Sequence, residues 1–155
     1  MCGIIGISSN KSVSANIINS LKKLEYRGYD SAGVATLSNG QINEIKSEGR
    51  VDNLEQNFDL KNLKGNIGIG HVRWATHGIP NSLNAHPHSS YNVSVVHNGI
   101  IENSTILKKH LVNKGHSFKS QTDTEVIVHL ITEHLKTLDL EEAITKTLKQ
   151  LHGSF

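Results

Sequence analysis

The sequence is short of several residue types, and each shortage excludes a class of protein. It has a single cysteine, Cys2, among 155 residues, so no intramolecular disulfide can form. No apolar run approaches the roughly 20 residues that a membrane-spanning helix needs, and no signal peptide precedes Cys2. We therefore expect a protein of the cytoplasm that has no membrane partner.

Aromatic residues are few and net charge is nearly absent. Aromatics make up 5 % of the residues and hydrophobic residues 36 %, so the core must consist mainly of Ile, Val and Leu. The formal net charge is only +2, and the basic residues are spread among acidic ones, which predicts no nucleic-acid partner. The length fits one domain that is large enough to bury a core.

The spacing of the apolar residues predicts strands mostly in the first part of the chain and helices mostly in the second, which is typical of α+β proteins. We expect strands at residues 4–7, 32–37, 42–48, 66–73 and 93–97, a hairpin turn at Asn39–Gly40, and the beginning of another strand at 153–155. We expect helices at residues 11–24, 51–58, 103–114, 122–135 and 139–151, the last with Leu140, Ile144, Leu148 and Leu151 facing inward.

Two segments have an unusual composition. In residues 66–73 isoleucine alternates with glycine, which predicts a strand with one flat face that another backbone or a ligand can approach closely. From residue 74 to residue 92 the periodicity vanishes, and both prolines occur there. A long irregular segment inside a compact domain is usually a functional lid or a binding loop.

Cys2 stands directly behind the initiator methionine and in front of a predicted buried strand. If Met1 is removed, Cys2 carries both a thiol and a free α-amine. An α-amine titrates at about pH 8, so a large part of it is neutral at the pH of a cell and can act as the base for the thiol. For Cys2 taken alone, the plainer interpretation of a small buried hydrophobic residue stays open.

Further candidate residues stand at the ends of predicted elements. Asn98 and Gly99 follow a strand, and an asparagine amide beside a glycine N–H can form an oxyanion hole, although the pair is also an ordinary turn sequence. Arg73 can hold a carboxylate bidentately or form a surface ion pair. Asp123 lies in the first turn of a predicted helix, where it can bind an ammonium group or simply stabilise the helix.

Histidines are frequent between residues 71 and 97, which raises the alternative of a metal site. No His-x-x-x-His pair lies on a predicted helix, and no cysteine stands beside the histidines to complete a zinc site. The metal interpretation is weakly supported, and we predict no metal. The histidines concerned are His71, His77, His86, His88 and His97.

Taken together, six segments resemble the N-terminal-nucleophile (class II) glutamine amidotransferases. They are CGIIG at residues 2–6, LEYRGYDSAG at 24–33, HVRWATHG at 71–78, NAHP at 84–87, HNGIIEN at 97–103 and SQTDTE at 120–125. Their order and spacing are most similar to the sugar-phosphate branch of this family, the glucosamine-6-phosphate synthases. Another branch, the amidophosphoribosyltransferases, has different residues at positions 26–31 and 74–76.

The resemblance implies the fold of that family, an αββα sandwich of two stacked, mostly antiparallel sheets. It also implies that residues 1–155 are the larger, N-terminal part of a glutaminase domain, and that the rest of this domain and the sugar-isomerase domains are absent. The implied substrates are L-glutamine and, only through the absent domains, fructose 6-phosphate. The full-length enzyme is expected to be a homo-oligomer, and no metal or organic cofactor is implied.

The resemblance assigns the catalytic roles to three residues. Cys2, after the loss of Met1, would attack the side-chain amide of glutamine and form a γ-glutamyl thioester. The α-amine of Cys2 would take the thiol proton and return it to the leaving ammonia. Asn98 and the Gly99 N–H would stabilise the tetrahedral oxyanion.

The resemblance assigns substrate binding to five residues. Arg73 would bind the α-carboxylate of glutamine and Asp123 its α-ammonium, so that the two charges together distinguish an α-amino acid from a plain amide. Trp74, Thr76 and His77 would lie in a covering loop that closes over glutamine and excludes water.

Two alternatives stay open. The chain could be the glutaminase domain of another class II amidotransferase, such as an amidophosphoribosyltransferase, which feeds ammonia to a different acceptor. It could also be an inactive fragment that binds glutamine or a partner subunit. Whether the mature chain begins at Cys2 discriminates between an enzyme and a binding module, because a blocked amine cannot act as the base.

Overall fold

The structure is a computed structural model that describes residues 2–75 and 78–155. Its strands are β1 (Gly3–Ser8), β2 (Ser31–Ser38), β3 (Gln41–Glu48), β4 (Ile67–Arg73), β5 (His88–Ser90), β6 (Val93–Val95), β7 (Ile100–Ile101) and β8 (Gly153–Ser154). Its α-helices are α1 (Ser14–Leu24), α2 (Asp52–Asn57), α3 (Ser104–Asn113), α4 (Glu125–His134) and α5 (Leu140–Leu148), with short 3-10 turns at Glu25–Arg27 and Leu60–Asn62.

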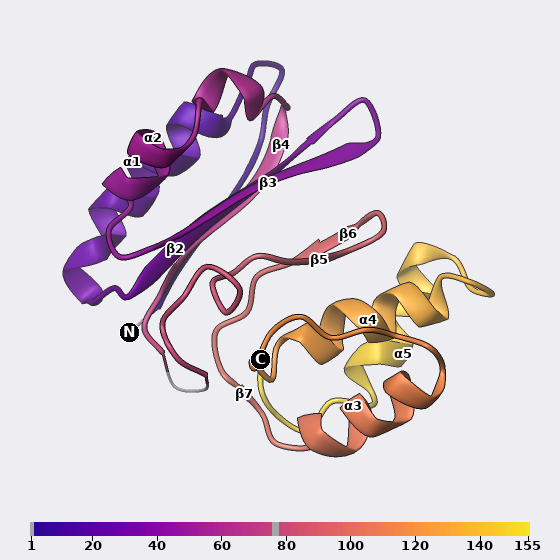
Figure 1. The fold of residues 1–155 in the computed structure, drawn as a ribbon. Helices are drawn as coiled ribbons and strands as arrows, with labels where there is room; N and C mark the ends of the chain where they lie inside the picture. Colours follow the sequence, from indigo (N-terminus) through magenta and orange to yellow (C-terminus); the bar gives the residue numbers. More distant parts are fainter. Residues whose placement is uncertain (1, 76–77) are drawn as a thin grey trace.

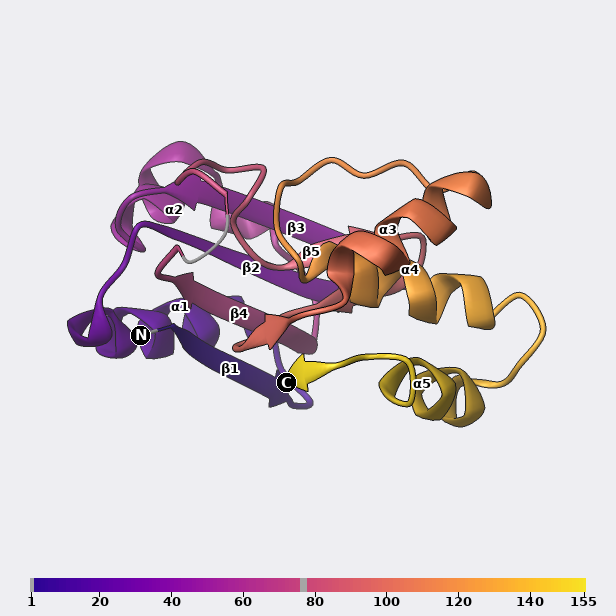
Figure 2. The same ribbon diagram turned by 90° about the horizontal axis from the view of Figure 1, so that it is seen from below.

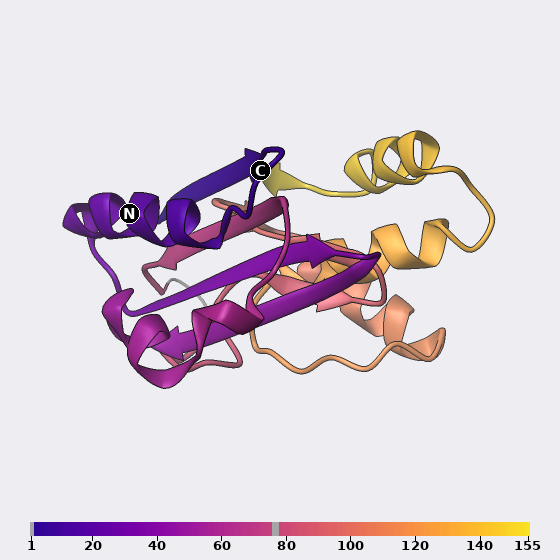
Figure 3. The ribbon, with the colours of Figure 1, turned by 90° about the horizontal axis from the view of Figure 1, so that it is seen from above.

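These elements are stacked in layers (Figure 1). Helices α1 and α2 cover one face of a four-stranded sheet, and the hairpin β5–β6 lies on the side of the other face. Helix α4 packs behind that hairpin, and α3 and α5 lie against α4. Figure 3 shows α1 and α2 in front of the sheet and α5 projecting away from it. The predicted α+β class is confirmed.

The four-stranded sheet is antiparallel throughout, with the order β1-β4-β2-β3. The turn between β2 and β3 is formed by Asn39 and Gly40, which have φ angles of 51° and 75°. Positive φ at both positions is what a two-residue type I′ hairpin needs, because its twist then matches that of the strands. The predicted hairpin is therefore confirmed.

The register around β4 places the chain segments that precede β1 and β2 on either side of the C-terminal end of β4. Gly3 lies opposite Val72 and Ser31 lies opposite Arg73, both in antiparallel pairs with β4. Cys2, which precedes β1, therefore starts beside the C-terminal end of β4. The same end of β4 is where the irregular segment after residue 73 begins.

The two faces of β4 have opposite characters. A Cβ atom on Gly68 or Gly70 would lie 2.7 or 2.5 Å from atoms of Ile17 in α1. The predicted flat face exists, but it is helix α1, and not a ligand, that approaches it. His71 and Arg73 alternate with these glycines, so the pleat directs both side chains to the opposite face.

The described residues form two apolar cores, one on each side of the sheet. The first lies between the sheet and the helices α1 and α2, and the second lies among β7, α3 and α4. The first core contains Val13, Ile17, Ile18, Leu21, Ala32, Val34, Val51, Leu54, Leu63 and Val72, and the second contains Ile101, Leu107, Leu111, Val126, Ile127, Leu130, Ile131 and Leu151. Ile5 and Ile7 pack on the first core, whereas Ile4 on the other face of β1 is exposed, so the strand predicted as buried is buried on one face only.

Two short strands were not predicted. Strand β5 lies inside the segment 74–92 that the sequence predicts as irregular, and it pairs with β6. Strand β7 pairs with β8, so the strand that the sequence predicts from residue 153 is confirmed (Figure 2). With three and two residues, β5 and β7 are too short for an alternation of apolar and polar residues to reveal them.

The prediction for helix α5 is wrong for three of its four inward residues. Leu140, Ile144 and Leu148 are 60, 38 and 46 % exposed, and only Leu151 is buried. The face that packs on α4 carries Ala143 and Thr147 instead. The Thr147 hydroxyl lies 3.0 Å from His134 Nδ1 of α4, so a small residue and a hydrogen bond set the contact face in place of the leucine stripe.

Among the described residues, no helix combines the length and the apolar character that crossing a membrane requires.

Candidate active site

A cavity of about 560 Å³ opens where the end of β4 meets the segments that follow β6 and precede α4. It brings together six of the eight residues that the sequence predicts for the site, namely Cys2, Arg73, Trp74, Asn98, Gly99 and Asp123. The other two, Thr76 and His77, lie outside the described residues. The cavity wall also includes Arg27, His71, His86, His97, Ile100, Thr122, Thr124 and Ser154.

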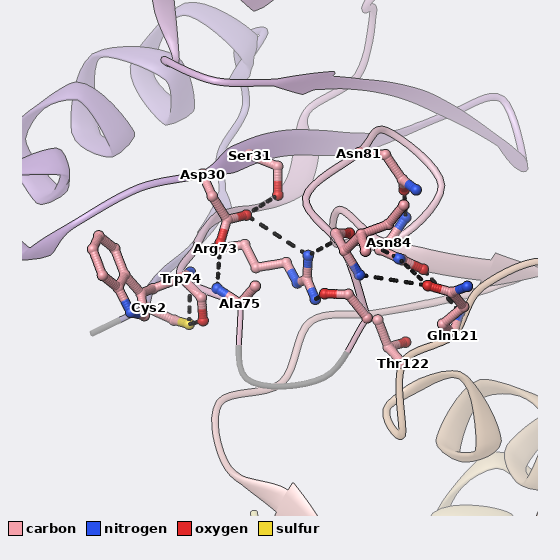
Figure 4. Close-up of polar contacts among 12 residues, drawn as sticks. Cys2, Asp30, Ser31, Arg73, Trp74, Ala75, Asn81, Asn84, Gln121 and Thr122 are labelled. Atoms are coloured by element: carbon pink, nitrogen blue, oxygen red, sulfur yellow. Dashed lines mark hydrogen bonds and ion pairs between the residues drawn. The ribbon is translucent and has the colours of Figure 1, made fainter.

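The thiol of Cys2 lies against the backbone of Trp74. The Trp74 N–H donates to Cys2 Sγ at 3.2 Å, and Sγ lies 3.4 Å from the Trp74 carbonyl oxygen (Figure 4). Pairing of β1 with β4 produces this contact, because the register that sets Gly3 opposite Val72 brings Cys2 level with Arg73, the last residue of β4, directly before Trp74. An N–H that points at sulfur stabilises the negative charge of a thiolate, so the position suits a nucleophile.

Asp30 holds the segment that contacts Cys2. Its carboxylate accepts hydrogen bonds from the Ala75 N–H and from the Ser31 hydroxyl, the latter at 2.8 Å (Figure 4). Its backbone N–H donates to the Arg73 carbonyl at 2.8 Å. Asp30 therefore fixes residues 73–75 from the side of β2. Sequence analysis assigns Asp30 no role, although it stands within one of the family-like segments.

The indole of Trp74 packs on the backbone of Gly28. Gly28 has a φ of +106°, and a Cβ atom there would lie 2.4 Å from the Trp74 ring. Any other residue at position 28 would thus be strained in its backbone and would collide with the indole. Gly28 lets Trp74 lie beside the mouth of the cavity.

Arg73 is 4 % exposed, which excludes the surface ion pair that the sequence left open. Its guanidinium donates to the carbonyl oxygens of Gly78 at 3.2 Å and Ile79 at 3.5 Å, and it lies 3.7 Å from the Asp30 carboxylate (Figure 4). A guanidinium has five N–H donors in a fixed fork, so it can hold this turn and still face the cavity.

The segment after residue 77 is tied down by two amide side chains that the sequence did not single out. Asn84 donates to the Ile79 carbonyl at 2.9 Å and accepts from the Gln121 N–H at 2.8 Å. The Gln121 side chain in turn accepts from Asn84 Nδ2 at 3.2 Å. These contacts join the predicted lid segment to the residues that precede α4. The only signal in the sequence for this role is that Asn84 and Gln121 both lie in family-like segments.

Asn98 and Gly99 present two hydrogen-bond donors to the cavity. Asn98 Oδ1 is occupied by His71 Nε2 at 2.9 Å. Gly99 has a φ of +143°, and a Cβ atom there would lie 2.0 Å from the Ser154 carbonyl oxygen, so strand β8 leaves room only for glycine. Within residues 2–75 and 78–155, neither Asn98 Nδ2 nor the Gly99 N–H donates to a protein acceptor.

Asp123 lies outside helix α4, which corrects the prediction that it sits in the first helical turn. The helix begins at Glu125, and the Glu125 carboxylate accepts from the backbone N–H groups of Lys119 and Ser120 at 2.8 and 2.7 Å. Asp123 is half-buried, and its Oδ2 accepts from the Ile101 N–H at 2.7 Å. Asp123 also lines the cavity.

The predicted histidine cluster forms a row of buried rings. His71 stacks on His86 with ring centres 4.3 Å apart, and His86 contacts His88 with ring centres 4.7 Å apart. Among the described residues, no group of three or more His, Cys, Asp and Glu side chains is placed to hold a metal ion. The three imidazole rings therefore pack against one another, and His71 lies at the end of the row that contacts Asn98.

Burial keeps these rings neutral at the pH of a cell. Desolvation lowers the pKa of His71 to about 4 and that of His88 to about 3, and it lowers the pKa of His86 well below the ordinary value of 6.5. A neutral imidazole has one N–H and one lone pair, so each ring can be a donor at only one nitrogen.

We expect the stability of the fold to decrease as the pH falls from about 6.5 to about 4. In this range the three histidines are protonated in the unfolded chain and neutral in the folded chain, so acid favours unfolding by about 1.4 kcal/mol per pH unit for each of them. Urea unfolding across this range measures the slope. A His88→Gln variant should have a flatter slope, whereas a change of the exposed His110 to Gln should leave it unchanged. A slope that His88→Gln does not alter would contradict this prediction.

Comparison with known sequences identifies the family of the chain. A family profile described as a glutamine amidotransferase domain matches residues 71–155, just over half of the chain. The glutamine–fructose-6-phosphate aminotransferase (isomerizing) of Bartonella henselae is 52 % identical over 156 residues, and that of Pyrococcus horikoshii is 53 % identical over 158 residues. Each alignment covers all of this chain and 26 % of the relative, so the chain spans about a quarter of the length of these relatives.

Comparison with solved structures agrees with the fold. A glutamine phosphoribosylpyrophosphate amidotransferase from B. subtilis superposes with a TM-score of 0.83 at 31 % identity, covering 99 % of this chain and 33 % of that chain. The allosteric regulatory enzyme of purine biosynthesis superposes with a TM-score of 0.84 at 32 % identity, covering 99 % and 34 %. The predicted N-terminal-nucleophile type of fold is confirmed. The sequence is more similar to the sugar-phosphate branch than to these two neighbours, as its motifs predicted.

Proposed function

Since the chain belongs to the family of glutamine amidotransferase domains, we propose that its cavity hydrolyses L-glutamine to glutamate and ammonia through a thioester on Cys2. The observation that carries this proposal is the composition of one cavity. Its wall holds the only thiol of the chain, two hydrogen-bond donors without a protein acceptor among the described residues, a buried cation and a half-buried carboxylate. Glutamine offers a matching group for each of them: its side-chain carbonyl for the thiol and the two donors, its α-carboxylate for the cation and its α-ammonium for the carboxylate.

In the proposed reaction, Cys2 Sγ attacks the side-chain carbonyl carbon of glutamine, and the thiol proton moves to the α-amine of Cys2. The carbon–nitrogen bond then breaks, and the α-ammonium returns the proton to the departing amide nitrogen, which leaves as ammonia. Water attacks the γ-glutamyl thioester, releases glutamate and restores the thiol. The Trp74 N–H beside Sγ supports the thiolate in the first step.

Asn98 and Gly99 stabilise the tetrahedral intermediate in this proposal. The attack converts the carbonyl oxygen of glutamine into an oxyanion, which needs two preorganised donors in a site that excludes water. The amide nitrogen of Asn98 and the N–H of Gly99 are adjacent in the chain and line the same cavity as Cys2. The close approach of Ser154 keeps the Gly99 backbone in place.

Arg73 and Asp123 bind the α-amino acid group of glutamine in this proposal. Arg73 offers a guanidinium to the α-carboxylate, and the carboxylate oxygen of Asp123 that does not bind Ile101 faces the α-ammonium. Burial makes both contacts stronger than they would be in water. Trp74, with Thr76 and His77, completes the covering loop in this proposal.

The acceptor of the ammonia belongs to the longer protein that the relatives represent. We propose fructose 6-phosphate, bound by further domains of a homo-oligomeric enzyme, because the curated relatives at about half identity are named for that sugar phosphate. The second candidate is phosphoribosylpyrophosphate, which appears in the name of a solved neighbour at 31 % identity. Supplying the intact protein with glutamine and each sugar phosphate in turn identifies the acceptor by its aminated product.

We expect Arg73→Ala and Asp123→Ala each to lower kcat/KM for glutamine by roughly 10- to 150-fold, the loss that follows from removing a charge-assisted contact of about 1.5–3 kcal/mol. Two analogues separate recognition from support of the loop. 4-Aminobutanamide lacks the α-carboxylate, so Arg73→Ala should not affect its hydrolysis. Glutaramic acid lacks the α-ammonium, so Asp123→Ala should not affect its hydrolysis. If either change lowers kcat/KM equally for glutamine and for the matched analogue, that residue acts on the structure and not on the substrate.

A further inference from the structure

We propose that His71 is a positioning residue of this reaction, one that fixes the carboxamide of Asn98 with its nitrogen toward the substrate. The inference rests on the proposed function, since it assigns to His71 the orientation of the oxyanion donor. The contact that carries it is the 2.9 Å hydrogen bond between His71 Nε2 and Asn98 Oδ1.

The orientation of the carboxamide decides whether Asn98 can donate a hydrogen bond to the oxyanion. Rotation of an asparagine amide by half a turn exchanges its oxygen and its nitrogen, which have nearly the same shape. With the nitrogen toward the cavity, Asn98 donates to an oxyanion, whereas with the oxygen there it repels the oxyanion. Asn98 is exposed on the cavity wall, and no other described side chain binds its carboxamide.

The surroundings of His71 make it a fixed donor. The residue is 1 % exposed on the inner face of β4, and its ring stacks on His86 at 4.3 Å. An amide oxygen can only accept, so the bond to Asn98 places the imidazole proton on Nε2. His71 Nδ1 has no partner of hydrogen-bond geometry among the described residues, although the backbone of His97 lies close enough to raise the pKa of the ring. The bond to Asn98 is therefore the contact of good geometry that places the proton on Nε2.

A separate set of contacts holds the backbone at Asn98, so the role of His71 is limited to the side chain. The preceding residue, His97, lies with Nδ1 2.9 Å from the Thr124 hydroxyl and Nε2 3.1 Å from the Ser154 carbonyl. Its backbone N–H donates to His86 Nδ1 at 3.4 Å. Removing the His71 donor should therefore release the Asn98 amide without moving the chain.

The test uses His71→Phe, which keeps a ring to stack on His86 and removes the donor. We expect kcat for glutamine to fall by roughly 10- to 100-fold, less than the ~10²–10³ expected for the loss of the Asn98 donor itself. We expect the dissociation constant for glutamine, measured in a Cys2→Ala background, to stay within about twofold. His71→Gln, whose side-chain amide can donate to Asn98, should recover much of the loss.

Two further measurements separate positioning from a merely structural effect. Glutamate γ-semialdehyde forms a tetrahedral adduct with a thiol, and its affinity should fall by the same factor as kcat in His71→Phe. In an Asn98→Ala background the His71→Phe change should cost nothing more, because the two residues act as one unit. The control is His88→Phe, which removes a buried imidazole of the same row that binds Thr122 and not Asn98, and which should keep kcat within about twofold.

Several outcomes would overturn the inference. They are an unchanged kcat in His71→Phe, an equal loss of affinity for glutamine and for the aldehyde, or a further loss in the Asn98→Ala background. If His71→Phe does not fold, His71→Asn, which is too short to reach Asn98, carries the same expectations. A protein with native His71 that neither hydrolyses glutamine nor binds the aldehyde would refute the proposed function instead.

Discussion

Replacement of Cys2 by alanine should abolish glutamine hydrolysis while glutamine still binds. Cys2 supplies the only thiol of the chain, and its Sγ lies in the wall of the cavity that also holds Arg73 and Asp123. Without the nucleophile no thioester can form, and removal of a catalytic nucleophile typically lowers turnover by at least about 10⁴-fold. The charges that would bind the head of glutamine are untouched, so its dissociation constant should change little.

Ammonia release from glutamine measures the loss, and calorimetric titration with glutamine measures the binding. Alanine is a suitable replacement because it is smaller than cysteine and leaves an α-amine at the same place after removal of Met1. Cys2→Ser adds a second check, since a hydroxyl in place of the thiol keeps the shape of the site but is a far weaker nucleophile. Near-normal turnover in Cys2→Ser would show that the nucleophile lies elsewhere.

A blocked α-amine at Cys2 should also lower turnover strongly, by roughly 10²–10⁴-fold, because the proposed general base is then part of a peptide bond. A matched pair can be made by cleaving a removable tag so that one protein begins at Cys2 and the other carries one additional glycine before it. Both forms keep the thiol, the Trp74 N–H and the oxyanion donors. The rate of hydrolysis and its dependence on pH are compared between the two.

The form that begins at Cys2 should gain activity as the pH rises through the titration of its α-amine, near pH 8. The extended form should not show this increase of activity with pH. Removal of the extra glycine by an aminopeptidase should restore the rate, which excludes permanent damage to the site. Full activity of a protein whose mass proves that a residue precedes Cys2 would refute the N-terminal-nucleophile assignment.

The sequence by itself determined the local elements and the chemical identity of the site. Alternation along residues 67–73 directed His71 and Arg73 to one face of β4, and the Asn39–Gly40 pair set the hairpin between β2 and β3. These features depend on backbone preferences and on a period of two, which neighbouring residues determine. The family-like segments likewise named residues that the fold brings to one cavity, because their chemistry is carried by residue type and order.

Predictions from the sequence were wrong where they depended on which neighbouring element a helix packs against. Leu140, Ile144 and Leu148 form a regular stripe, yet α5 turns Ala143 and Thr147 toward α4. A helical period tells that a helix is amphipathic, but the neighbouring helix decides which face is the contact face. The start of α4 after Asp123 likewise depends on contacts outside the helix. The Glu125 carboxylate binds the backbone N–H groups of residues 119 and 120.

Only the tertiary structure decided how the site is supported. Asp30 reaches Ala75 across 45 positions of the chain, Asn84 reaches Gln121 across 37, and His71 reaches Asn98 across 27. Each of these contacts is made by a polar side chain that carries no period and no local propensity, and two of the contacts end on a backbone N–H. Their distances are set by strand register and by the packing of separate layers, which is a property of the folded chain and not of any segment of its sequence.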